Sequence, residues 1–148
     1  MRAILIDPEK QTFTEIQLNG DDYREINSIL CCRSHTLGAH LNGSIAKGFD
    51  AVYASDDCLE DRDDPRFWFQ VDAERDPPSS FPIAGLGLAL GTDTEGAGCD
   101  VRISVEELAK RVTFTRRKFR GFDVSETRYG IKVDVKAPII DGADELDG

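Results

Sequence analysis

The sequence has no long apolar run, and this absence excludes several classes of protein. The apolar run near the N-terminus, Ala3–Ile6, ends after four residues, which is too short for the core of a signal peptide. No other stretch approaches the roughly 20 apolar residues of a membrane-spanning helix. We therefore expect a cytoplasmic protein without a membrane partner, in which the four cysteines are reduced.

Cysteine and histidine also lack the spacing of a metal site. Zinc ligands usually come in closely spaced pairs, which let two side chains reach one tetrahedral ion. A helix-end chelate or a Cys–His nucleophile pair would use Cys32 with His35, but no third group that would orient the histidine is indicated. We expect no cofactor and no metal site. Small buried thiols and surface imidazoles explain these residues better: Cys31, Cys32, His35, His40, Cys58 and Cys99.

Basic residues are scarce, with 18 Lys and Arg against 28 Asp and Glu, which gives a formal net charge of −10. This balance argues against the whole protein being a general nucleic-acid binder, because phosphate groups would be repelled. Six of the basic residues nevertheless fall within Lys110–Arg120. Such segregation of charge indicates an electrostatic partner, which is either another molecule or the protein's own acidic segments.

Length and patterning predict one compact α+β domain, built mainly from an antiparallel sheet with two short helices. Asn42-Gly43 predicts a turn, and Asp22 and the Ser104–Glu107 capping box predict two helix starts. The domain should span residues 1–137, end in a basic hairpin at 114–137 and be followed by a disordered acidic tail at 138–148. The first helix should span 22–31, and the apolar face of the second helix should comprise Val105, Leu108, Ala109 and Val112. Ser125–Thr127 should form the turn of the last hairpin. The predicted strands are 3–7, 12–18, one within 36–42, 49–55, 67–71, 85–91, 118–124 and 129–136.

Two patterns resemble ligand-binding motifs only in part. Gly85–Gly91 carries glycines like a dinucleotide fingerprint, but the third glycine comes one residue too late and the run itself predicts a strand. Glycines in a strand more often mark close backbone packing. Asp56–Asp64 is rich in carboxylates but lacks the glycine required at the sixth position of a calcium loop. A solvated acidic loop is the better explanation.

The basic stretch nevertheless provides one candidate binding surface. Lys110 and Arg111 end a predicted helix, where cations complement the carbonyl end of the helix dipole. The other four cations lie beside phenylalanines, an arrangement that suits phosphate and base contacts. Alternatively, the segment is a solvated strand whose cations pair with the acidic tail. The candidate polyanion surface comprises Arg116, Arg117, Lys118 and Arg120.

A second candidate surface carries the opposite charge. Its carboxylates would imitate phosphates and enter the nucleic-acid groove of another protein. The candidate acidic surface comprises Asp56, Asp57, Glu60, Asp61, Asp63 and Asp64.

Four segments carry a resemblance to a known family: Val52–Asp57, Phe67–Phe69, Phe81–Gly96 and Ser104–Leu108. Together with the N-terminal hairpin and the Tyr-Arg-Glu-Ile start of the first helix, they resemble small proteins of unknown function that occur mainly on phages, plasmids and other mobile elements. The resemblance covers residues 1–114 and implies no catalytic residues. The basic hairpin and the acidic tail lie outside it.

These observations favour a non-enzymatic interaction or accessory protein of a mobile element or its host, with another protein as its partner. No motif supplies a nucleophile together with its base. One version is an acidic DNA mimic that inhibits a nucleic-acid or defence enzyme. Two alternatives stay open: a nucleic-acid-binding module that uses the basic hairpin, and an enzyme with a carboxylate or Cys/His site. The sequence does not indicate an oligomeric state.

Overall fold

The computed structural model describes residues 1–20, 22–56, 67–73, 82–115, 117–118, 122–135 and 139–140. All strand pairings found there are antiparallel, and two short helices accompany them. The predicted α+β class with a mainly antiparallel sheet is therefore confirmed, whereas a single compact domain stays a prediction. None of the helices in this part of the chain is long and apolar enough to cross a membrane.

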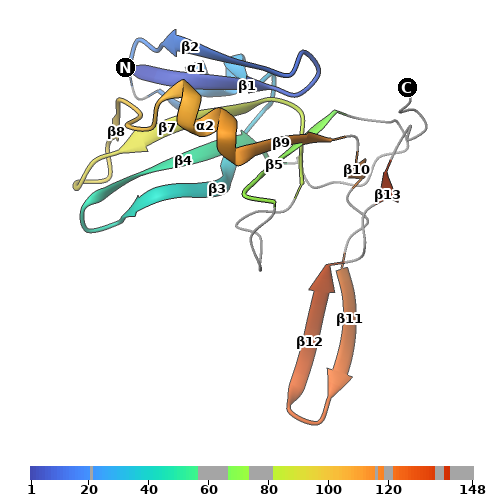
Figure 1. The fold of residues 1–148 in the computed structure, drawn as a ribbon. Helices are drawn as coiled ribbons and strands as arrows, with labels where there is room; N and C mark the ends of the chain where they lie inside the picture. The colour runs from blue at the N-terminus through green and yellow to red at the C-terminus, as the bar shows by residue number, and fades with distance from the viewer. Residues whose placement is uncertain are drawn as a thin grey trace.

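An open sheet of six strands forms the centre of the fold (Figure 1). Its first two strands make the predicted N-terminal hairpin, and the turn is held by Asp7 Oδ1, which accepts hydrogen bonds from the backbone N–H groups of Glu9 and Lys10. The strand order is β2-β1-β7-β4-β3, with β8 paired to β7. The strands are β1 (Arg2–Asp7), β2 (Thr12–Gln17), β3 (His35–Ser44), β4 (Gly48–Ser55), β7 (Gly87–Thr92) and β8 (Gly98–Cys99).

The helix α1 (Tyr23–Ile29) covers one face of this sheet. Asp22 caps it as predicted, because its side chain accepts a hydrogen bond from the backbone N–H two residues later at 2.9 Å. The helix ends two residues before the predicted end. Its buried residue Ile26 belongs to the same apolar cluster as Leu88 and Leu90 of β7.

The opposite face is covered by a second helix and a three-stranded sheet. The predicted capping box is present: Ser104 Oγ accepts from the Glu107 backbone N–H at 3.0 Å, and the Glu107 carboxylate accepts from the Ser104 N–H at 3.4 Å. Leu108 is buried as predicted, but Ala109 is exposed, so the apolar face is narrower than expected. These elements are β5 (Trp68–Val71), β6 (Ile83–Ala84), α2 (Val105–Arg111) and β9 (Val112–Thr115), and the strands pair in the order β6-β5-β9.

Most of the glycine run forms a strand, as predicted, but β7 begins at Gly87, because Gly85 has a positive φ of 86° and lies outside the strand. A Cβ added at Gly87 would lie 2.5 Å from Phe69 Cζ of β5. The side chain of Phe69 can therefore reach the central sheet only because residue 87 has no side chain.

The turn between β3 and β4 lies further along the chain than predicted. Asn42 and Gly43 are part of β3 and pair with Asp50 and Phe49, and residues 45–47 form the turn. Asn42 stays in the strand because its side chain bonds to Asp50: Nδ2 donates to Oδ2 at 3.0 Å, and Oδ1 accepts from the Asp50 N–H at 3.1 Å. Gly43 has a positive φ of 79°, as expected for a turn glycine, but it is paired with Phe49 within the β3–β4 ladder.

The last residue of α2 is tied to the end of β5. Arg111 Nε and Nη2 donate to the two carboxylate oxygens of Asp72 at 3.0 and 2.6 Å. The hydrogen bond to Asp72 raises the pKa of Arg111 above its usual value, against the opposing effect of burial. The sequence explained a cation at this position by the helix dipole alone. The structure shows that Arg111 also has a specific partner, Asp72.

Beyond β9 the described residues form two separate strand pairs. β11 (Phe122–Thr127) pairs with β12 (Gly130–Val135), and this hairpin extends away from the central sheet (Figure 1). Residues 128–129 close it, so the turn predicted at Ser125–Thr127 is wrong. The two-residue strand β10 (Arg117–Lys118) pairs with β13 (Ile139–Ile140), which lies within the segment predicted to be a disordered tail.

Candidate functional site

Neither charged surface predicted from the sequence lies fully within the described residues. Arg117 and Lys118 form β10, whereas Arg116 and Arg120 lie outside the described residues. Asp56 is exposed, and its carboxylate accepts a hydrogen bond from the hydroxyl of Ser34. The other five acidic candidates also lie outside the described residues, so both surfaces stay predictions: Asp57, Glu60, Asp61, Asp63 and Asp64.

The cysteines and histidines considered as metal ligands are placed mostly apart. Cys31 is exposed, Cys99 lies in β8, and the ring of His40 lies 5.9 Å from that of Phe49. Cys58 is outside the described residues. Within the described part of the chain, no three His, Cys, Asp or Glu side chains form a group that could hold a metal ion.

Cys32 and His35 do share a partner, Asn27 of α1. Asn27 Nδ2 donates to the carbonyl of Arg33 at 3.0 Å, which fixes the orientation of the amide. Asn27 Oδ1 then lies 2.5 Å from His35 Nδ1 and 3.8 Å from Cys32 Sγ. Because an amide oxygen can only accept, Nδ1 of a neutral His35 carries the proton and Nε2 keeps its lone pair. Asn27 is the orienting group that sequence reasoning missed.

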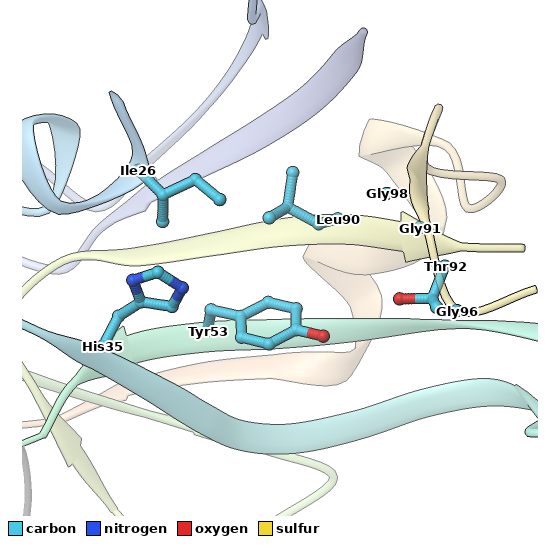
Figure 2. A pocket seen from close by; sticks show the side chains of 8 residues that line it. All are labelled: Ile26, His35, Tyr53, Leu90, Gly91, Thr92, Gly96 and Gly98. Atoms are coloured by element: carbon cyan, nitrogen blue, oxygen red, sulfur yellow. The ribbon is translucent and has the colours of Figure 1, made fainter. Parts of the chain in front are cut away.

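His35 and Tyr53 line a cavity of about 140 Å³ between α1 and strands β3, β4 and β7 (Figure 2). Their rings meet edge to face, with centroids 5.9 Å apart and planes at 85°. Ile26 and Leu90 form an apolar wall, and Thr92 contributes a second hydroxyl. Glycines complete the lining: Gly91, Gly96 and Gly98.

Strand register explains why these side chains come together. Tyr53 pairs with Leu88 and His35 pairs with Ser55, so the aromatic residues share the sheet face on which α1 packs. The seven-residue helix packs over Leu88 and Leu90, which are buried, but leaves His35 and Tyr53 half-buried. The cavity is therefore the uncovered end of one face of the sheet.

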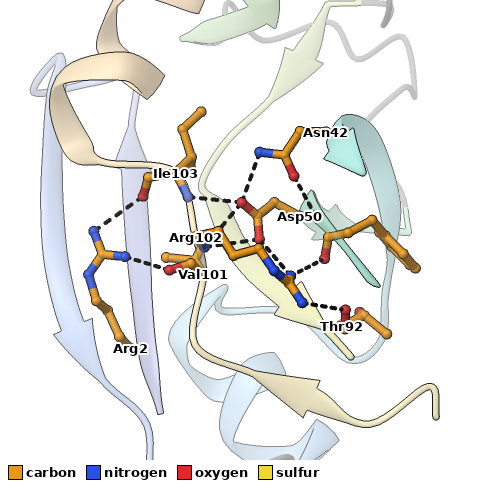
Figure 3. Close-up of polar contacts among 8 residues, drawn as sticks. Arg2, Asn42, Asp50, Thr92, Val101, Arg102 and Ile103 are labelled. Carbon is orange, nitrogen blue, oxygen red and sulfur yellow. Dashed lines mark hydrogen bonds and ion pairs between the residues drawn. The ribbon is translucent and has the colours of Figure 1, made fainter. Parts of the chain in front are cut away.

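Asp50 of β4 is a second candidate for a functional side chain, because its carboxylate is fully buried. The backbone N–H groups of Arg102 and Ile103 donate to it at 3.0 and 2.9 Å, Asn42 Nδ2 donates at 3.0 Å, and Arg102 Nη1 lies at 3.3 Å. Figure 3 shows these donors converging on the carboxylate. Because its oxygens are already engaged, Asp50 has a structural role: it fastens the segment before α2 to β3 and β4.

Comparison with known proteins provides no relative from which a site could be transferred: no family model matches the chain, and no curated protein or solved structure is significantly similar to it. The resemblance to mobile-element proteins stays a prediction. The case for a function rests on the geometry of the described residues.

Replacing Asp50 with alanine is expected to lower the free energy of unfolding by about 3 kcal/mol or more, because buried N–H groups lose their acceptor. Urea unfolding, followed by the fluorescence of the sole tryptophan, Trp68, measures the change. Glu9→Ala, at an exposed position in the β1–β2 turn, is the control and should change the stability by less than about 0.5 kcal/mol. A loss below about 1 kcal/mol for Asp50→Ala would contradict the anchoring role.

Replacing Asn27 with alanine is expected to change the tautomer of His35, because Nδ1 loses the acceptor that holds its proton. Long-range ¹H–¹⁵N correlation spectra of the imidazole rings report the tautomer directly. His40, the only other histidine, provides an internal reference that should not change. Ser28→Ala, at the exposed neighbouring position of α1, is the matched control. We call the hydrogen bond from His35 Nδ1 to Asn27 Oδ1 the Asn27 clamp. Identical His35 signals in the wild type and in Asn27→Ala would show that this clamp does not set the tautomer.

Proposed function

We propose that the protein acts by binding another protein, and that the β11–β12 hairpin provides the contact surface. The observation that supports this most strongly is the exposure of large apolar side chains on the hairpin. Val124 is 66% exposed, Ile131 71% and Tyr129, in the turn, 92%. Exposed apolar side chains gathered on one element are typical of interaction sites.

The register separates the hairpin into an apolar and a polar face. Val124 and Ile131 lie on the same face, because Ile131 pairs with Glu126, which is two residues beyond Val124 in β11. The alternate positions carry polar residues and glycine: Ser125, Thr127, Gly130 and Lys132. An isolated two-stranded hairpin is at best marginally stable in water. A partner that covers the apolar face would supply the missing burial.

A protein partner fits the described residues better than a nucleic acid does. Phosphates require cations, whereas the face of the hairpin that carries Val124 and Ile131 presents exposed aliphatic side chains. Arg117 and Lys118, the described members of the basic candidates, pair through their backbone with Ile139–Ile140. The acidic residues of the tail follow this strand in the sequence, from Asp141 on, so pairing of the cations with the tail stays the competing prediction.

The proposal keeps the accessory role in a mobile element or its host that the sequence resemblance implies. The contact surface, however, is the apolar face of the β11–β12 hairpin and not the acidic or basic surface expected from the sequence. An acidic surface that imitates DNA would add electrostatic attraction to a basic partner, but it is not required for the hairpin to bind.

Site-specific photo-cross-linking tests the proposal. A photoreactive phenylalanine analogue is placed at Val124 or Ile131 on the apolar face, or at Ser125 or Lys132 on the polar face, in cells of the source organism. We expect discrete protein adducts from the apolar-face positions and few or none from the polar face. Adducts of twice the protein's own mass would identify a second copy as the partner.

The double variant Val124→Lys/Ile131→Lys should abolish the adduct formed from a reporter at Tyr129, because it buries two charges in the contact. Ser125→Lys on the other face should leave that adduct unchanged. Unchanged Trp68 fluorescence in both variants verifies that the body of the protein is intact. Equal adducts from both faces, or no adduct from the apolar face, would overturn the proposal.

A further inference from the structure

The cavity beside His35 presents three polar groups to which no described residue bonds. They are the second ring nitrogen of His35, the hydroxyl of Tyr53 and the hydroxyl of Thr92. In Figure 2 the two hydroxyls lie at one end of the cavity and the imidazole at the other. A ligand that fills this space would meet an acceptor nitrogen at one end and two hydroxyl donors at the other.

The lining carries no charged side chain, which restricts the ligand to neutral molecules. Apart from His35, the lining residues are aliphatic, hydroxylic or glycine. A charged ligand would lose its hydration without gaining a counter-charge. The protein's net charge of −10 additionally repels anions.

The volume and the walls of the cavity restrict the ligand further. A cavity of about 150 Å³ is large enough for benzene, so the 140 Å³ measured here accommodates about one six-membered ring. Tyr53 and His35 offer aromatic surfaces, and Ile26 and Leu90 offer aliphatic ones. Flat aromatic rings pack well against such walls.

We propose that this cavity is a binding site for a neutral, single-ring heteroaromatic molecule that carries an N–H donor and a carbonyl acceptor. The N–H group donates to His35 Nε2, whose lone pair is held available by the Asn27 clamp. The carbonyl oxygen accepts from the hydroxyl of Tyr53 or Thr92. Pyrimidine bases and nicotinamide have this chemistry, whereas a whole nucleotide exceeds the cavity. The site is separate from the hairpin, so it acts independently of the proposed partner binding.

The test uses the full-length, ¹⁵N-labelled protein with uracil and nicotinamide as probes. Binding with a Kd of about 1 mM or tighter should shift the imidazole signals of His35 and leave those of His40 unchanged. Benzene, which has no polar group, and benzoate, which is charged, are the comparison ligands. Both should bind at least about tenfold more weakly than uracil, because one lacks the hydrogen bonds and the other lacks a counter-charge.

Tyr53→Phe keeps the ring against His35 and removes one donor, so it should weaken uracil binding by about tenfold. Tyr129→Phe, which removes the hydroxyl of the exposed hairpin tyrosine, is the matched control and should have no effect. Thermal unfolding of each variant verifies that the fold is retained. Equal binding of benzene and uracil, equal shifts at His35 and His40, or no shift at about 10 mM probe would each overturn the proposal.

Discussion

The buried carboxylate of Asp50 is the interaction on which the rest of the structure depends. It lies in a central strand and receives hydrogen bonds from β3 through Asn42 and from the backbone before α2 at Arg102 and Ile103. The same backbone segment is held from the other side by Arg2 of β1, which donates to the carbonyls of Val101 and Ile103. The segment 101–103, which has no regular secondary structure, is thereby fixed to the sheet, and α2 starts from a defined position.

This network also explains which parts of the fold could be predicted from sequence. The N-terminal hairpin, the cap at Asp22 and the capping box at Ser104 depend on neighbouring residues, and all three are confirmed. The turn at Asn42-Gly43 was wrong because Asn42 is needed by Asp50, a tertiary demand that outweighs the turn preference of the dipeptide. Periodicity alone does not reveal such a demand. In the C-terminal hairpin, alternation predicted the second strand, whereas the first strand was expected at 118–124 and lies at Phe122–Thr127, so the turn was misplaced as well.

The candidate cavity was predictable only in part. Cys32 and His35 stood out as a pair, but Asn27 reads as an ordinary polar position of a short amphipathic helix. Tyr53 reads as an alternate residue of a strand. They meet because the short α1 leaves one end of the sheet face uncovered, which is a consequence of packing between segments far apart in the chain. Asparagine favours caps and turns over helix interiors, so Asn27 inside α1 is the one local signal that could have pointed to a specific role for its side chain.

The two proposed surfaces place different demands on the chain. The cavity sits on a rigid framework of paired strands, so a ligand there costs little ordering of the protein. The hairpin has no such support, because within the described residues β11 and β12 pair only with each other. Its stability must therefore come from the face that carries Val124 and Ile131, both of which are exposed. A partner that buries this face contributes to folding the hairpin as well as to binding it, and part of the binding free energy is spent on that ordering.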